Sequence, residues 1–490
     1  MATPLQTQRT NRDLPAKGHL PRSVWNMAFT ELWERFSFYG LQGILTFYLL
    51  YSLDKGGMAL DPLIASSIVG AYGGSVYLAQ LLGAWLGDRL ISPRVMVLLG
   101  GIVITAGHLA LAFLEGFPGL MAGLALIVLG TGALKTNITS IVGYIMDSSP
   151  DTRDVGFSYF YMAINIGAVI GPLSTGFVQN QFGFHLGFGL AAVGMVGALV
   201  QYAVSMKKLP SKASTVNNRL PRNKYYVPLL ALLLTGSAAF LAVISGSVNP
   251  SNLATVVTLI ALAAALAYFI VMLTSKTVST PEKKRVLGFF PLFLISGIYF
   301  GFLFQKFTAV SILITKRVNL DMGDWTFPVA WITTVSPLAA VLITPLISRL
   351  WTRLSHRQPS PVTKFAIGMM QIGCAYLFIL LVASSTGDAQ IPLLLILLFM
   401  MIAGSSEVFV GPIGLSLATR IGPKTFKSQM VGLNFLTLAL GSSLSGLLGQ
   451  LFTKIENTTY FTLIATAGVV LGMTLLATRK PINRLLTSDA

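Results

Sequence analysis

The chain has 490 residues, of which 54% are hydrophobic and only 10% are charged. An average soluble domain has about 25% charged residues, so this composition excludes an ordinary soluble protein. The formal net charge is +17. We attribute this excess to membrane topology and to anionic lipid headgroups, and we expect no nucleic-acid partner.

Fourteen apolar segments are long enough to cross a bilayer, since spanning about 30 Å at 1.5 Å per residue takes about 20 residues. The sequence therefore predicts an all-α polytopic membrane protein with fourteen transmembrane helices (14 TM). In chain order the segments cover residues 24–51, 62–88, 95–114, 118–146, 155–182, 184–206, 226–246, 252–275, 288–315, 327–351, 363–384, 391–419, 427–453 and 458–478.

The segments fall into two sets of six, separated by an extra pair at 226–246 and 252–275 that contains no charged residue. Interior charges in both sets predict two related bundles around a midplane site, with the extra pair at the periphery. The predicted organisation is a cytoplasmic N-terminal segment 1–23, an N-terminal six-helix bundle 24–206, basic linkers with the inserted helix pair 207–287, a C-terminal six-helix bundle 288–478 and a cytoplasmic tail 479–490.

The loops on the two sides of the membrane differ strongly in charge. Counting alternate loops, 27 of the 34 Lys and Arg residues fall on the side of the two termini, and four fall on the opposite side. Lys and Arg are enriched in cytoplasmic loops. We therefore expect a multi-pass protein of the plasma (inner) membrane with both termini in the cytoplasm.

The first apolar segment contains three charged residues, Glu31, Glu34 and Arg35. At helical spacing they stand at i, i+3 and i+4, which places them on one face, with Glu31 one turn before Arg35. A charge at membrane depth costs about 2.5–3.5 kcal/mol or more, so it usually faces a partner or a water-filled path. This pattern indicates the wall of a pathway.

Three more charges lie at membrane depth: Lys135, Lys306 and Glu407. The six charged residues comprise three acids and three bases. Such a balance is expected, because an isolated ion is costly to desolvate and would lose its charge. Static salt bridges between helices are one interpretation, but buried pairs stabilise poorly compared with apolar packing. We favour a substrate pathway. In it, the cations of the first half bind a carboxylate of the substrate and Glu407 binds its amine, so the site suits a zwitterion.

Two motifs resemble known transporter signatures. The first segment reads Glu31-x-x-Glu34-Arg35-Phe36-x-Phe38-Tyr39-Gly40, and the fifth reads Phe160-Tyr161-x-x-Ile164-Asn165-x-Gly167. They are similar to the patterns ExxERFxYYG and FYxxINxG of the proton-dependent oligopeptide transporter family (POT/PTR), within the major facilitator superfamily. The resemblance covers essentially the whole chain and includes the extra helix pair of bacterial members.

The resemblance implies the major facilitator fold and a proton-coupled symporter that imports di- and tripeptides by alternating access. It implies that Arg35 and Lys135 meet the peptide carboxylate, while Glu31 and Glu34 exchange protons with them. The implied proton-coupling residues are Glu31, Glu34, Arg35 and Lys135. The implied substrate-binding residues are Arg35, Tyr39, Tyr77, Lys135, Asn165, Gln305, Ser336, Glu407 and Asn434.

Several positions depart from the family pattern. The usual Lys-Pro-Asn is Lys135-Thr136-Asn137, which removes a helix-kinking proline and predicts a straighter segment. In the ninth segment, Phe304 stands in place of the family's acid, followed by Gln305 and Lys306. Two helical positions are about 200° apart, so we expect Lys306 to face nearly opposite to Phe304 and leave open whether it reaches the cavity. Ser336 and Asn434 also differ from the residues common in the family.

Two other classes of protein fit the sequence less well. A membrane enzyme would need a nucleophile or metal cluster, and the sequence contains no HExxH, GxSxG or Cys/His cluster. We therefore expect no enzymatic activity, no cofactor and no metal. A facilitator of another organic anion or a drug, not necessarily proton-driven, stays open because of Phe304. The expected partners are a peptide, protons and membrane lipids, and we expect a monomer.

Overall fold

The structure, a computed structural model, describes residues 20–147, 153–216, 218–387 and 389–488. Residues 1–19 of the predicted N-terminal segment and 489–490 of the predicted tail lie outside the described residues. Thirteen helical segments of the described part are long and apolar enough to cross a membrane. Helix α1 (Arg22–Leu50) has 29 residues and supplies the fourteenth, although its buried charges make it less apolar. The predicted all-α polytopic fold is confirmed, and the number of spans in the described part is consistent with the fourteen predicted.

The observed helices agree with the predicted segments to within a few residues, except where a span is broken. Two short helices, α7 (Ser211–Ser214) and α18 (Arg479–Leu486), lie outside the spans. The remaining helices are α2 (Pro62–Arg89), α3 (Pro93–Phe113), α4 (Gly116–Met146), α5 (Arg153–Phe182), α6 (Phe184–Ser205), α8 (Tyr226–Ile244), α9 (Leu253–Thr274), α10 (Thr280–Leu303), α11 (Ala309–Arg317), α12 (Val329–Leu354), α13 (Pro361–Thr386), α14 (Leu393–Ser405), α15 (Gly411–Ile421), α16 (Lys427–Phe452) and α17 (Asn457–Ala477).

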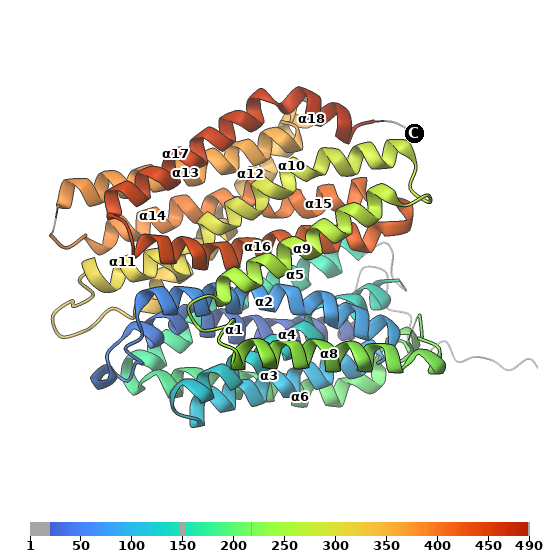
Figure 1. Ribbon diagram of the computed structural model, residues 1–490, viewed down its shortest axis with the longest axis horizontal. Coiled ribbons are helices and arrows are strands. Elements are labelled where there is room, and N and C mark those ends of the chain that lie inside the picture. Colours follow the sequence, from blue (N-terminus) through green and yellow to red (C-terminus); the bar gives the residue numbers. More distant parts are fainter. Residues whose placement is uncertain (1–19, 148–152, 217, 388, 489–490) are drawn as a thin grey trace, which may run out of the picture.

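Helices α1–α6 pack together in the lower half of Figure 1, and α10–α17 pack together in the upper half. The two groups meet where α2 packs on α16 and where α5 packs on α12. At the first contact Gly70 lies against Gly446, and a Cβ on Gly70 would come within 2.5 Å of the Gly446 Cα. Small residues let the two backbones approach closely, as is common between transmembrane helices.

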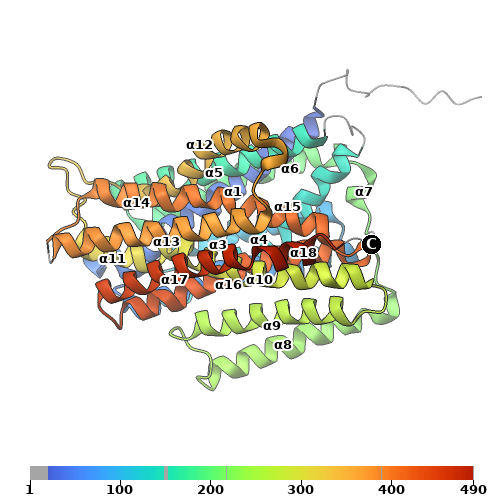
Figure 2. The ribbon, with the colours of Figure 1, turned by 90° about the horizontal axis from the view of Figure 1, so that it is seen from above.

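The inserted pair α8 and α9 lies at the edge of the molecule, as Figure 2 shows. Helix α9 packs against α2 and α16, and the Ala254 N–H donates to Ser67 Oγ at 3.2 Å. Helix α8 leaves large apolar side chains such as Leu234 and Phe240 more than 60% exposed. An apolar helix with no buried face is stable when lipid surrounds it.

Two spans are interrupted within the membrane. Helix α10 continues into α11 through a 3₁₀ turn at Phe304–Phe307, and α14 continues into α15 through a 3₁₀ turn at Ser406–Phe409. Pro412 stands in the first turn of α15, where its missing N–H costs nothing. Irregular backbone at membrane depth is tolerated where protein buries it or where it lines a cavity. Both breaks lie at such a place.

Helices α2 and α4 cross at glycines close to Lys135. A Cβ on Gly83 would overlap the carbonyl oxygen of Gly132. One turn along α4, Asn137 Nδ2 donates to the Gly83 carbonyl at 3.0 Å and to the Ala133 carbonyl at 2.8 Å. This crossing holds α4 close to α2, and it thereby positions the helix that carries Lys135.

We expect Gly83→Ala to destabilise the protein by about 1–3 kcal/mol, because the added methyl must push α2 and α4 apart. Unfolding of the detergent-purified protein, followed by intrinsic fluorescence, measures the effect. Gly197→Ala on α6 is the matched control, because a Cβ there meets no atom within 4 Å. Equal stability of the two variants would show that the α2–α4 crossing is looser than described.

Candidate functional site

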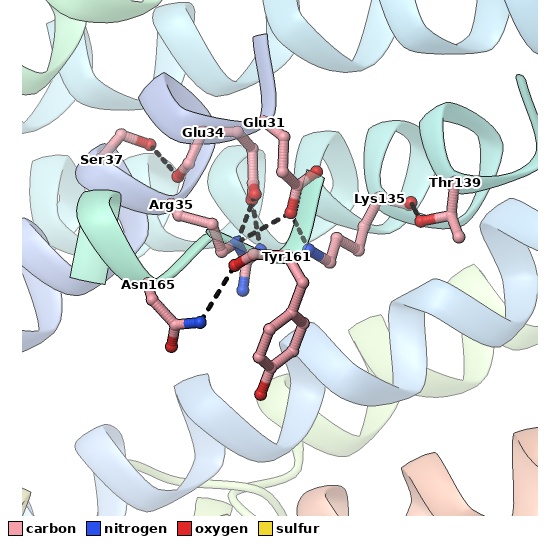
Figure 3. A network of polar contacts seen from close by, with 8 residues as sticks. All are labelled: Glu31, Glu34, Arg35, Ser37, Lys135, Thr139, Tyr161 and Asn165. Carbon is pink, nitrogen blue, oxygen red and sulfur yellow. Dashed lines mark hydrogen bonds and ion pairs between the residues drawn. The ribbon is translucent and has the colours of Figure 1, made fainter. Parts of the chain in front are cut away.

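Four charged side chains of the N-terminal bundle form one buried network (Figure 3). Arg35 on α1 donates to Glu34 through Nε at 2.5 Å and through Nη2 at 2.6 Å. Its Nε also lies 3.7 Å from Glu31 Oε1. The same Oε1 atom accepts a hydrogen bond from Lys135 Nζ on α4. Glu31 thus joins the two helices through their charged side chains.

Pairing lets this network exist at membrane depth. Glu31, Glu34 and Arg35 are at most 3% exposed, and unpaired charges so deeply buried would cost several kcal/mol each. The Arg35–Glu34 contact is bidentate, and bidentate ion pairs of this kind are among the strong charge-assisted hydrogen bonds. In chemical terms, a proton added to Glu31 would release Lys135, and a proton added to Glu34 would leave Arg35 with only the longer contact to Glu31.

A cavity of about 660 Å³ lies between the two bundles, in the usual size range of small-molecule sites. Its wall is formed by α5 and α12, by both helix breaks, and by single residues of α1, α2, α15 and α16. Apolar side chains such as Ile166, Phe304 and Val341 form much of the surface. The polar and charged residues of the wall are Tyr39, Tyr77, Ser158, Tyr161, Asn165, Lys306, Thr344 and Glu407.

The cavity extends toward one side of the membrane. Its wall runs along α5 from Ile170 back to Ser158 and along α12 from Pro337 to Pro345. It thus extends toward the N-terminal end of α5 and toward the C-terminal end of α12, which leads into a basic segment with Arg349, Arg353 and Arg357. Beyond the other end, the bundles are in direct contact. There Trp331 Nε1 donates to the Leu173 carbonyl at 2.9 Å, closing α12 against α5.

Lys306 and Glu407 are the charged residues of the cavity wall. Lys306 Nζ donates to Ser336 Oγ at 3.1 Å. Within the described chain, the Glu407 carboxylate makes no hydrogen bond and no ion pair within 4.0 Å. The ammonium and the carboxylate interact electrostatically through the low-dielectric interior. The C-terminal bundle thus presents one cation and one anion to the same space.

Comparison with known proteins identifies the family. A family model described as the POT family matches residues 94–469. The chain belongs to the POT family. A di-/tripeptide transporter of Lactococcus lactis subsp. cremoris is 34% identical over 480 residues, which are 95% of this chain and 96% of that protein.

Solved structures of the POT family share the fold over nearly the whole chain. The peptide transporter POT in complex with sulfate has a TM-score of 0.90 and 35% identity, covering 96% of this chain and 97% of that one. A POT family transporter in complex with 5-aminolevulinic acid has a TM-score of 0.90 and 30% identity, covering 96% and 98%. The protein is therefore a multi-pass membrane transporter.

The structure brings together part of the set of residues that the POT resemblance implies. Four of them lie in the cavity wall: Tyr39, Tyr77, Asn165 and Glu407. Arg35 and Lys135 lie outside this wall, where Glu34 and Glu31 hold them. Tyr39 lies between the two sites, because the Arg35 guanidinium carbon is 5.9 Å from the centre of its ring.

Three implied binding residues lie outside the cavity wall in this structure. Gln305 is fully buried and its Oε1 accepts a hydrogen bond from the Tyr460 hydroxyl on α17 at 2.5 Å. Ser336 lies behind Lys306, and the Asn434 side chain packs beside Gly414 of α15. Direct contact of these three residues with substrate stays a prediction. Gln305 lies in the 3₁₀ turn after α10, whereas Ser336 and Asn434 lie on the unbroken helices α12 and α16, where other residues line the cavity.

The expectation that Phe304 and Lys306 face opposite sides is wrong, because both line the cavity. That expectation assumed an unbroken α-helix. Residues 304–307 instead form a 3₁₀ turn, and Thr308 follows at φ −129° and ψ −99°. The α-helical rotation of 100° per residue does not apply there. The expected effect of Lys135-Thr136-Asn137 agrees with the structure, since α4 continues from Gly116 to Met146.

Tyr161 is a cavity residue to which the sequence reasoning assigned no role. It stands four positions before Asn165, whose Nδ2 donates to the Tyr161 carbonyl at 3.0 Å, and both side chains line the cavity. Figure 3 shows its ring pointing away from the charged network. The i, i+4 spacing within the FYxxINxG motif was a signal that could have identified it.

We expect Glu31 and Lys135 to be energetically coupled by about 1–3 kcal/mol in a double-mutant cycle with Glu31→Gln and Lys135→Met. Glu31→Gln alone should cost more than the double substitution, because it leaves a buried ammonium without its carboxylate. Equilibrium unfolding in detergent measures all four proteins.

The exposed pair Lys212–Asp147, at 3.1 Å, is the matched control for this cycle. Lys212→Met and Asp147→Asn should show a coupling energy below about 1 kcal/mol, as is usual at the surface. Additive effects of the Glu31 and Lys135 substitutions would contradict the described pairing.

Proposed function

We propose that the protein is a proton-coupled symporter that imports di- and tripeptides by alternating access. The observation that carries the proposal is the cavity between the bundles, with Glu407 and Lys306 in its wall and the Glu31–Glu34–Arg35–Lys135 network on its N-terminal side. A peptide is a zwitterion with uncharged polar groups between its ends. The cavity offers charges of both signs, together with the hydroxyl and amide groups of Tyr39, Tyr77, Tyr161 and Asn165.

The network supplies a means of coupling protons to substrate. While Glu31 and Glu34 are ionised, they occupy Lys135 and Arg35. A proton on Glu31 frees Lys135, and a proton on Glu34 leaves Arg35 with only its 3.7 Å contact to Glu31, so either cation becomes more available to the peptide carboxylate. Because proton binding and carboxylate binding then favour each other, the coupling is reciprocal, as linkage requires. This route does not use the position of Phe304, so it operates without an acid there.

The other end of the peptide is assigned to Glu407 and Asn165. The Glu407 carboxylate lines the cavity without a hydrogen-bond partner among the described residues, and Asn165 lines the same cavity from α5 of the N-terminal bundle. A carboxylate paired with an ammonium group makes a strong charge-assisted contact. This arrangement favours substrates with a free amino group over those in which the amine is blocked.

The described conformation corresponds to the inward-facing state in this proposal. Its cavity extends toward the side where basic loops gather, which is the cytoplasmic side by the positive-inside rule. Both ends of the chain then lie in the cytoplasm, and the membrane is the plasma (inner) membrane. The excess of basic residues on that side attracts anionic lipid. We expect the transporter to act as a monomer.

We expect proteoliposomes containing the protein to accumulate dialanine when an inward proton gradient and a negative-inside potential are imposed. Uptake of radiolabelled dialanine, with and without the gradient, measures this. Counterflow without gradient-driven accumulation would contradict proton coupling and leave a peptide exchanger. Absence of both uptake and dialanine binding by folded protein would contradict the peptide substrate and favour another organic anion or a drug.

Glu407→Gln should weaken dialanine binding at least about tenfold, since contacts to charged groups contribute about 1.5–3 kcal/mol. Binding of N-acetyl-dialanine should change little, because this peptide has no ammonium group. Isothermal titration calorimetry on purified protein measures both peptides. The exposed Glu115→Gln is the matched control. Equal losses for both peptides would show that Glu407 does not bind the amine.

A further inference from the structure

We infer that Lys306 determines substrate specificity by binding the side-chain carboxylate of a peptide whose first residue is acidic. The inference rests on the proposed peptide transport and names a preference within it. It concerns a residue that the family pattern does not explain, at a turn where Phe304 stands in place of the usual acid.

Lys306 is the cation that the cavity wall presents to a ligand. The other two membrane-depth cations, Arg35 and Lys135, are each held by a glutamate of α1. An anion entering the described cavity therefore meets Lys306 without first displacing a bound carboxylate. In this respect Lys306 differs from both cations of the N-terminal bundle.

The position of Lys306 is set by the structure around it. Its ammonium donates to Ser336 Oγ at 3.1 Å, and its carbonyl accepts from Ser311 Oγ at 2.6 Å. The ammonium also lies 5.1 Å from the centre of the Phe307 ring. Lysine has three donors, and Ser336 is its one hydrogen-bond partner among the described residues. Two donors are left for a ligand.

Glu407 decides which part of the peptide reaches Lys306. The two side chains belong to the same bundle, face the same cavity and interact electrostatically. A peptide amine bound to Glu407 places the first residue of the peptide beside Lys306. The carboxylate of an Asp or Glu side chain is then close to the ammonium. The C-terminal carboxylate lies further along the peptide, where the proposed function assigns it to Arg35 and Lys135.

The charge balance of the wall supports the same preference. Lys306 and Glu407 give the wall a net charge of zero. With Lys306 neutralised, Glu407 alone would face an acidic side chain, and like charges repel strongly in a low dielectric. Phe304 adds no compensating charge. With Lys306 charged, the cavity accepts acidic side chains, and without that charge it rejects them.

The test compares Asp-Ala with Asn-Ala, which have nearly the same shape and differ in the charge of one side chain. Lys306→Met keeps a long side chain and removes the charge. We expect the ratio of Asp-Ala to Asn-Ala uptake, each as kcat/KM in proteoliposomes, to fall at least about tenfold in this variant. Lys306→Arg, which keeps the charge, should retain most of the ratio.

Lys316→Met is the matched control, because Lys316 lies on α11, is exposed and is absent from the cavity wall. It should leave the ratio unchanged. Calorimetry also gives the binding constants of Asp-Ala and Asn-Ala, and hence their ratio. This measurement needs no transport, so it distinguishes an effect on binding from an effect on proton coupling. Dialanine binding and the elution profile of each variant show that it is folded.

An unchanged Asp-Ala to Asn-Ala ratio in Lys306→Met overturns the inference and leaves peptide transport intact. Equal losses for Asp-Ala, Asn-Ala and dialanine also overturn it, because Lys306 would then be a general counter-ion of Glu407. Failure of the unsubstituted protein to take up dialanine overturns the proposed function, and the inference falls with it. A selective loss of Asp-Ala, with Asn-Ala affected much less, supports the inference.

Discussion

Charge inside a membrane is costly because the hydrocarbon core cannot solvate it, so each charged side chain at membrane depth needs a partner or a water-filled space. The two bundles meet this requirement differently. In the N-terminal bundle, Glu31 and Glu34 hold Lys135 and Arg35 directly, so the charges are paired within the protein. In the C-terminal bundle, Lys306 and Glu407 face a shared cavity without direct contact. The N-terminal bundle holds its charges in pairs and the C-terminal bundle exposes its charges to the cavity, and the proposed function uses this difference to couple a proton to a substrate.

Backbone breaks and close helix crossings put these charges where they can act. Lys306 and Glu407 both lie in 3₁₀ turns that interrupt spanning helices. Lys135 lies on an unbroken helix, held against α2 by the Gly83–Gly132 crossing. At a helix break the rotation per residue differs from that of an ideal α-helix. Side chains that an ideal helix would point away from the cavity can therefore face it. On the unbroken helix α4, the position of Lys135 is fixed relative to the helix as a whole.

The fold was predictable from the sequence to a large extent, and the site less so. Helix positions follow from the lengths of the apolar segments, because the bilayer sets how many residues a span needs. The clustering of Glu31, Glu34 and Arg35 follows from their i, i+3 and i+4 spacing on an intact helix. Gln305 and Lys306 lie in a turn whose rotation no periodic rule describes. Gln305 turned out to contact Tyr460 and not the cavity.

The membrane class, the predicted spans, the family and the six charges at membrane depth all follow from the amino-acid sequence. These features depend on composition, local spacing and short motifs, which are properties of the linear chain. The folded bundles show which carboxylate pairs with which cation, and they place both Lys306 and Phe304 in the cavity wall. Such pairings join helices that are far apart in sequence, and they depend on crossing points and turn geometry that arise only when the bundles pack.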